Sequence, residues 1–140
     1  MYAEKLKQFK NVENLGGKAW EHATAIDLIS HSEIAHCSMH CFHYQQMFEL
    51  LLKHLLETKT KSGAFPRSHK LNHLFSLLVE SLALELDAEK YFDALGTITT
   101  CAEAYRYDFS LDCETYRHAV SSLDVLLDDL IKLTISEKIT

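Results

Sequence analysis

The stretch that most constrains the fold of this chain runs from Glu33 to Thr58 and has the apolar spacing of one long helix. Apolar residues cover one face of this helix and continue onto its other side, so we expect neighbouring elements around most of its circumference. Gln45, Glu49 and Lys53 recur at every fourth position within the apolar surface. Such residues stack along one line of a helix, so a mostly buried helix should carry a polar line that needs partners.

The composition is that of a single globular, helix-favouring domain. Of its 140 residues, 47% are apolar and 24% are charged. The N-terminus is charged, no apolar run is long enough to span a membrane, and we therefore expect a cytoplasmic protein without a membrane contact. The four cysteines lack a CxxC spacing, and Cys37 and Cys41 lie one helical turn apart, a poor position for a mutual disulfide. We expect reduced cysteines in the core.

The apolar spacing predicts an all-α, up-and-down bundle of about five helices. A short charged helical arm is expected near the N-terminus, with the pair Gly16 and Gly17 interrupting or ending it. Residues 1–17 form this arm and residues 18–140 a single domain. The expected helices cover 18–32, 33–58, the segment from the cap Ser68 to Leu82, 88–107 with an interruption near Gly96, and 113–135.

The longest expected loop precedes the third helix and is locally basic. The net charge of −6 disfavours avid, sequence-independent binding to nucleic acid. Four basic residues nevertheless cluster within twelve positions, namely Lys59, Lys61, Arg67 and Lys70. Amide hydrogens at the helix start, with Arg67, His69 and Lys70 beside them, could receive a phosphate or carboxylate. A solvated loop that keeps the protein soluble is the simpler alternative.

Three histidines on the central stretch are a candidate metal site. His36, His40 and His43 are spaced so that their imidazoles share one helical face. Helical metal proteins usually draw ligands from several helices and use Glu-x-x-His pairs, which the other expected helices lack. We therefore predict no cofactor and keep a metal-binding helical bundle as an alternative. No P-loop, dinucleotide-binding turn, nucleophile elbow or HExxH motif is present.

Three sequence blocks, in this order, resemble the HEPN domain family. They are FHYQQMFELLLKHLL in the central stretch, SHKLNHLFSLL after the loop, and AYRYDF at the end of the fourth helix. Trp20 and the pair Asp27 and Leu28 resemble the opening helix of the family. The resemblance implies a helical bundle that usually forms a homodimer, with a polar cleft associated with nucleotide or RNA. Many such proteins work beside a minimal nucleotidyltransferase as a toxin–antitoxin pair.

Toxic HEPN proteins are metal-independent ribonucleases whose motif this chain does not match. Their motif is an Arg, a polar residue and, after four to six intervening residues, a His. Here eleven residues separate Arg106 from the next histidine, His118, and Arg117 is adjacent to His118. The chain thus resembles the branch that lacks the motif, and we predict a binding protein rather than an enzyme. A divergent ribonuclease that uses Arg106 or Arg117 with His118 is the alternative.

The resemblance also assigns polar residues by matched position. Gln45 and Glu49 fit an internal polar network, because a carboxylate suits a buried cation better than a phosphate. The predicted ligand-binding residues are Lys53, Arg67, His69, Lys70, Tyr105 and Arg106. For Arg106, a role in the internal network fits equally well. We expect Lys53 and Arg106 to share one recess that takes a nucleotide, RNA or a nucleotidyltransferase partner.

Overall fold

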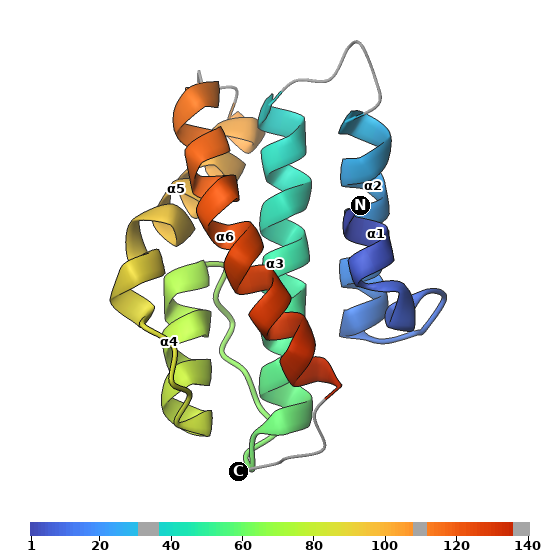
Figure 1. Cartoon of the computed structure of the whole chain (residues 1–140), viewed down its shortest axis with the longest axis vertical. Coiled ribbons are helices and arrows are strands. Elements are labelled where there is room, and N and C mark those ends of the chain that lie inside the picture. Colours follow the sequence, from blue (N-terminus) through green and yellow to red (C-terminus); the bar gives the residue numbers. More distant parts are fainter. Residues whose placement is uncertain (31–36, 108–111, 136–140) are drawn as a thin grey trace.

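The computed structural model describes residues 1–30, 37–107 and 112–135, with side chains described in 1–30, 37–103 and 112–135. All regular elements in these ranges are helical, so the predicted all-α bundle is confirmed (Figure 1). The elements are α1 (Tyr2–Lys5), the 3₁₀ turn η1 (Lys7–Phe9), α2 (Leu15–Ser30), α3 (Cys37–Lys59), α4 (Leu71–Leu82), α5 (Ala88–Tyr107) and α6 (Cys113–Thr134). No helix in these ranges has both the length and the apolar character needed to cross a membrane.

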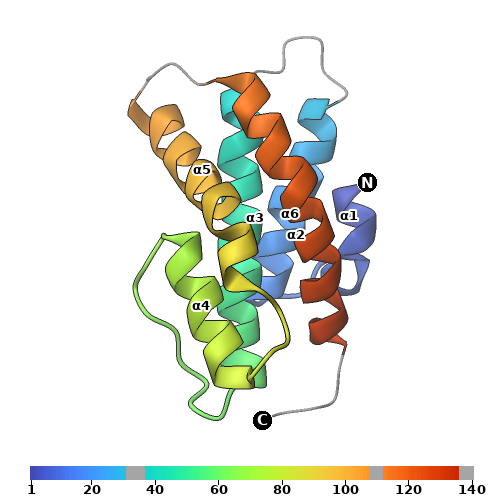
Figure 2. The same cartoon turned by 60° about the vertical axis from the view of Figure 1, so that its left-hand side comes forward.

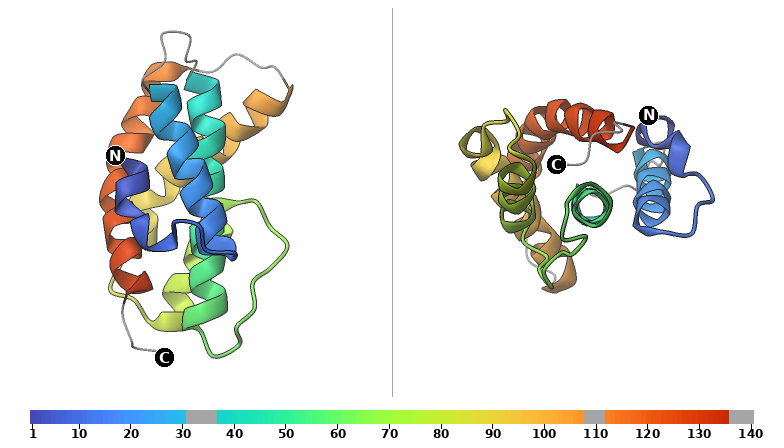
Figure 3. Two further views of the ribbon diagram at one scale, coloured as in Figure 1. Left: turned by 90° about the vertical axis from the view of Figure 1, so that its right-hand side faces the viewer. Right: turned by 90° about the horizontal axis from the view of Figure 1, so that it is seen from below.

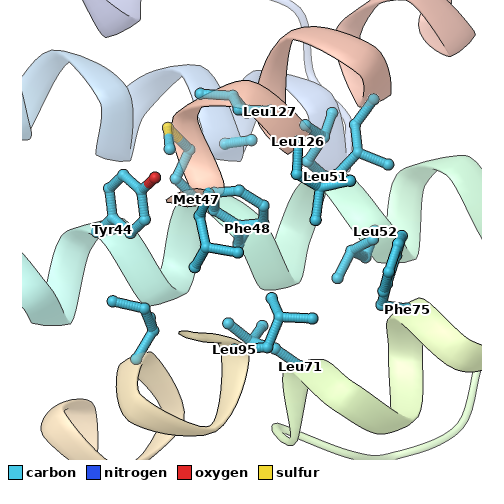
Figure 4. Close-up of a cluster of buried hydrophobic side chains, with 14 of the residues drawn as sticks. Tyr44, Met47, Phe48, Leu51, Leu52, Leu71, Phe75, Leu95, Leu126 and Leu127 are labelled. Atoms are coloured by element: carbon cyan, nitrogen blue, oxygen red, sulfur yellow. The ribbon is translucent and has the colours of Figure 1, made fainter. Parts of the chain in front are cut away.

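Helix α3 is the axis of the bundle, as its sequence predicts. It contacts α2, α4, α5 and α6, and the view along the bundle places it among them (Figure 3). Phe48 and Leu51 are fully buried and face Leu127 of α6 on one side and Leu95 of α5 on another (Figure 4). Burial of these large apolar side chains supplies the main driving force for folding.

The segment before α2 folds back onto the bundle because two glycines let it approach closely. Gly16 and Gly17 lie in the first turn of α2 and do not interrupt a helix. A Cβ atom on Gly16 would lie 2.4 Å from the Phe9 ring, and one on Gly17 would lie 1.7 Å from the carbonyl oxygen of Val12. The side-chain oxygen of Asn14 accepts a hydrogen bond of 2.8 Å from the Gly17 amide. Helix α2 therefore begins three residues earlier than predicted.

The N-terminal segment is part of the core. The side chains of Tyr2, Leu6 and Phe9 are buried. The carboxylate of Asp27 on α2 accepts hydrogen bonds of 3.0 Å from the backbone amides of Tyr2 and Ala3. These contacts hold α1 between α2 and α6 (Figure 3).

Two predicted helix details differ in the structure. Lys70, not Ser68, is the N-cap residue of α4, and the Lys70 amide donates to the Ser68 hydroxyl at 3.2 Å. The first amide of α4, at Leu71, donates to the Thr99 hydroxyl of α5 at 3.3 Å. Helix α5 runs through Gly96 without a break. A partner on another helix thus replaces the local cap that the sequence suggested.

The prediction of reduced cysteines is wrong, because the structure pairs all four. One disulfide joins Cys37 of α3 to Cys113 of α6, with 5.8 Å between their Cα atoms. The other joins Cys41 of α3 to Cys101 of α5, with a Cα separation of 6.2 Å. Both separations suit disulfides. As expected, Cys37 and Cys41 do not pair with each other. Their partners lie on other helices, and the spacing of cysteines along one helix does not predict such pairs.

Candidate functional site

The polar line of α3 meets the loop before α4 and forms the Glu49 cluster, which consists of Gln45, Glu49, Lys53 and His69. The Glu49 carboxylate accepts hydrogen bonds from Gln45 Nε2 at 2.9 Å and from Lys53 Nζ at 3.0 Å. The His69 Nδ1 atom lies 3.0 Å from both carboxylate oxygens. Gln45 Nε2 also donates to the backbone carbonyl of His69 at 3.1 Å. The cluster therefore fixes the loop to α3.

The charges of the Glu49 cluster are compensated within the protein. Glu49 is 4% exposed and Lys53 is 9% exposed. Burial alone would raise the pKa of Glu49, but hydrogen bonds from Gln45, Lys53 and His69 outweigh it and hold this pKa below its ordinary value. The Lys53 ammonium also lies 5.5 Å from the centroid of the Phe65 ring, within cation–π range. Lys53 is thus engaged with Glu49 and Phe65 rather than open to a phosphate.

The other predicted ligand residues of this region lie at the surface. Arg67, His69 and Lys70 are exposed, and the His69 side chain keeps 68% of its surface accessible despite its contact with Glu49. The structure therefore brings Lys53 and His69 together through Glu49 and leaves Arg67 and Lys70 beside them in solvent.

The structure separates Lys53 from Arg106. Tyr105 and Arg106 lie in the last turn of α5, where only the backbone is described. The disulfide between Cys41 and Cys101 fixes the level at which α3 and α5 meet. Lys53 lies twelve residues further along α3, or about 18 Å at the helical rise, whereas the end of α5 continues toward the start of α3 (Figure 2). The backbones of Lys53 and Arg106 therefore lie at different levels of the bundle, and the Arg106 side chain is outside the described residues.

A pocket of about 470 Å³ lies near the start of α3, between α1, α2, α3 and α6. We call it the Arg117 pocket. Its lining combines apolar side chains with hydroxyl, imidazole and guanidinium groups, and includes Tyr2, Ser30, His40, Tyr116, Arg117 and Val120. Neither the α3–α4 loop nor the Glu49 cluster contributes to it. The two sites lie toward opposite ends of α3.

The Arg117 pocket has neutral walls and a permanent cation. The His40 Nδ1 atom is hydrogen-bonded to the Tyr116 hydroxyl. Burial lowers the pKa of His40, so this imidazole is neutral at pH 7, and burial raises the pKa of Tyr116. Arg117 is exposed and stays charged at any physiological pH. The arrangement suits one anionic group next to an aromatic or apolar body.

A half-buried carboxylate organises the inner side of this region. Asp124 of α6 accepts hydrogen bonds from the Tyr2 hydroxyl at 2.9 and 3.0 Å and from the Tyr44 hydroxyl at 2.8 Å. The Tyr2 ring also lies edge-on to the His40 and Tyr44 rings, at 6.5 and 5.7 Å. These contacts fix the tyrosine and histidine side chains before any ligand arrives.

Arg117 lines a pocket with a different histidine from the one that the sequence suggested. His118 is exposed and does not line the pocket, whereas His40 does. Adjacent residues on a helix point about 100° apart, so Arg117 and His118 do not face one ligand together. Tyr116 and His40 are 76 positions apart. No local motif in the sequence connects Tyr116 to His40.

The histidines proposed for a metal site have separate partners. His40 contacts Tyr116, whereas the His43 Nδ1 atom lies 2.9 Å from the Nδ1 atom of His22 on α2. His36 lies outside the described residues. Within the described ranges, no group of three or more His, Cys, Asp or Glu side chains is placed to hold a metal ion.

A family model described as the HEPN domain matches residues 18–132. The chain belongs to the HEPN family. No curated protein and no solved structure matches it significantly. The HEPN match contains the Glu49 cluster and most of the Arg117 pocket, whereas Tyr2 comes from the segment before it. This HEPN protein therefore adds a wall to the pocket from outside the matched region.

Proposed function

We propose that this HEPN protein is a binding protein that takes the phosphate-bearing end of a nucleotide or RNA in the Arg117 pocket and leaves RNA uncut. The observation that carries the proposal is a pocket whose lining includes Arg117, neutral His40 and Tyr116. An Arg guanidinium recognises phosphate with paired hydrogen bonds, and tyrosine rings provide stacking surfaces for bases. The volume falls in the range of small-ligand sites.

The proposal assigns different roles to the residues predicted from the sequence. Arg117, with Tyr116 and His40, takes the central position that we first gave to Lys53 and Arg106. Arg67 and Lys70, exposed beside the Glu49 cluster, remain candidate contacts for the backbone of a longer RNA. Tyr105 and Arg106, in the last turn of α5, remain candidate contacts as well.

Two further parts of the proposal rest on the family resemblance. We propose a homodimer, and we propose that a minimal nucleotidyltransferase is its partner in a toxin–antitoxin arrangement. Light scattering on the purified protein measures the first. Co-expression with a nucleotidyltransferase encoded next to this chain, followed by size-exclusion chromatography, measures the second.

The binding test uses a fluorescently labelled single-stranded RNA and, separately, calorimetry with AMP and ATP. Wild type should bind, and Arg117→Ala should weaken binding at least tenfold, about 1.4 kcal/mol, through loss of a charge-assisted contact. Lys132→Ala removes an exposed cation from the same helix, outside the pocket, and should bind like wild type. Equal affinities of wild type and Arg117→Ala would overturn the proposed site.

A second candidate function is a divergent, metal-independent ribonuclease. The observation that favours it is that Arg117 and His40 line the same pocket. RNA cleavage without metal needs a base for the 2′-hydroxyl proton and a cation near the developing phosphorane charge. Incubation of labelled RNA with the protein in EDTA decides between the two functions. Cleavage that stops in His40→Ala but persists in His118→Ala would establish this ribonuclease and exclude the original pairing with His118.

A further inference from the structure

Two histidines outside the Arg117 pocket face each other across the interface between α2 and α3. The Nδ1 atoms of His22 and His43 are 2.9 Å apart, and their ring centroids are 5.2 Å apart. The two helices lie side by side in Figures 1 and 3, and both side chains are half-buried. Neither residue touches the Glu49 carboxylate or lines the Arg117 pocket in the contacts described above. The pair thus has no role in the proposed function.

We propose that His22 and His43 bind one divalent transition-metal ion through their Nδ1 atoms. Imidazole nitrogen is a preferred ligand for copper, nickel and zinc. At metal–nitrogen distances of about 2.0–2.1 Å, two ligands at right angles lie about 2.9 Å apart, whereas tetrahedral ligands lie about 3.3 Å apart. The observed separation matches right-angled coordination, so Cu²⁺ and Ni²⁺ fit the pair as it stands and Zn²⁺ requires a small opening.

The protonation state of the pair favours metal binding at neutral pH. Burial, together with the neighbouring His43, lowers the pKa of His22, and burial lowers the pKa of His43. Both imidazoles are therefore neutral, as metal ligation requires. Without metal, one Nδ1–H donates to the other Nδ1. Binding moves that proton to Nε2 of the same ring, so the step releases no net proton.

The charged residues near the histidine pair favour a bound cation overall. Glu21 and Glu49 both raise the pKa of His22 through their negative charges, whereas Lys18 lowers it. The Phe42 ring lies edge-on to both imidazoles, at 6.3 Å from His22 and 5.2 Å from His43, and limits their movement. With two protein ligands, water molecules fill the remaining positions. This favours exchangeable binding over a permanent structural metal.

Such an ion would connect α2 to α3 directly. A ligand that binds the folded state and not the unfolded chain raises the melting temperature, by an amount that grows with the ratio of free ligand concentration to Kd. Metal binding at this pair should therefore stabilise the bundle without any contribution from RNA or nucleotide. Its failure would leave the Arg117 proposal unaffected, because the two measurements share no residue and no ligand.

In the test, copper(II) sulfate is titrated into the metal-free protein at pH 7.5. The disulfides are kept intact. We expect one ion per chain in the micromolar range, an electron paramagnetic resonance spectrum with two equatorial nitrogens, and a higher melting temperature. His22→Ala and His43→Ala should each weaken binding at least tenfold. His73→Ala is the control, because His73 is an exposed histidine on α4.

The chain has nine histidines, so the variants assign the site. Copper binding that is equal in His22→Ala, His43→Ala and wild type would overturn the proposal. If either variant fails to fold, the wild-type protein still decides, because a copper spectrum without two equatorial nitrogens also overturns it.

Discussion

The two halves of α3 are held in the bundle by different kinds of interaction. The first half is joined covalently to α6 and α5, through Cys37 and Cys41. The second half is joined to the loop before α4 by the contacts of Glu49 and Gln45 with His69. The first half also meets the Asp124 carboxylate of α6, which accepts a hydrogen bond from Tyr44. In the second half, the cation Lys53 is used by its internal partner Glu49.

The contrast explains why the two cations differ as ligand-binding groups. Lys53 is 9% exposed and forms a salt bridge of 3.0 Å with Glu49. Arg117 is exposed, and among the described residues it forms no ion pair. A phosphate that approached Lys53 would meet the Glu49 carboxylate, whereas one that approached Arg117 would meet hydroxyl and imidazole groups. A basic residue therefore has to be judged by its partners, not by its charge alone.

The largest effect on stability should come from breaking the two disulfides in the first half of α3. Reduction of both disulfides should lower the free energy of unfolding by about 4 kcal/mol or more, since each closes a loop of many residues in the unfolded chain. Denaturant unfolding with and without reductant measures this change. A reducing compartment would have the same effect as added reductant, because disulfides rarely persist there.

A matched pair of variants separates the two bonds. Replacing Cys37 and Cys113 by Ser should weaken ligand binding, because Cys37 lines the Arg117 pocket. Replacing Cys41 and Cys101 should mainly lower stability. Four free thiols in the unreduced, denatured wild type would contradict both disulfides.

Removal of the Glu49 carboxylate, in the second half of α3, should have the next largest effect on stability. Glu49→Ala leaves Lys53 buried without its partner and should lower the free energy of unfolding by about 3 kcal/mol. The control is His69→Ala, which removes the exposed member of the cluster and should cost much less. Chemical denaturation measures both variants. An unchanged stability in Glu49→Ala would show that the cluster does not fix the loop to α3.

Acid should remove the stability contributions of the half-buried and buried histidines and of Glu49 in different pH ranges. Burial lowers the pKa of His22, His40, His43 and His54. The unfolded chain therefore binds these protons more readily, and stability should fall as the pH drops below about 6.5. The pKa of Glu49 is also lowered, so its contribution should be lost only below about pH 4.3.

Unfolding midpoints measured between pH 8 and 3 follow this acid effect. Glu49→Gln should remove part of the lower step and leave the upper one. A stability that stays constant from pH 8 to pH 5 would contradict the contribution of the buried histidines.

The smallest effect on stability is expected from the hydrogen bonds that Tyr2 and Tyr44 donate to Asp124. Tyr44→Phe removes one of the hydroxyl donors to Asp124, while Tyr2 keeps its own. We expect a loss of about 1.5 kcal/mol, typical of a hydrogen bond to a charged group. Thermal unfolding with circular dichroism measures it. A loss as large as that of Glu49→Ala would mean that both halves depend on buried charge to a similar degree.

The sequence predicted those features that depend on neighbours along one helix. Periodicity identified α3 as the central helix, and the four-residue spacing of Gln45, Glu49 and Lys53 predicted a polar line that needs partners. Contacts between distant segments were not accessible in this way. The start of α2 depends on how closely Gly17 approaches Val12, and the disulfide partners of α3 lie on other helices.

In the candidate site, too, contacts between distant segments were harder to predict than features within one helix. Matched family positions assigned polar roles to His69 and Glu49, and the structure brings the two together across 20 positions of sequence. The same matching did not predict the distance between Lys53 and Arg106, because it contains no information about where along α3 the end of α5 lies. Arg117 was considered only with its neighbour His118, since its place beside His40 results from the packing of α6 on α3.

The burial of Tyr2 has a practical consequence for experiments on this protein. Met1 and Tyr2 lie on the wall of the Arg117 pocket, and Asp27 holds the backbone of this segment in place. A purification tag or fluorophore fused ahead of Met1 would emerge at the rim of the pocket and compete sterically with incoming molecules. Probes for affinity measurements therefore belong on an exposed position far from this rim, such as Lys61 in the loop before α4.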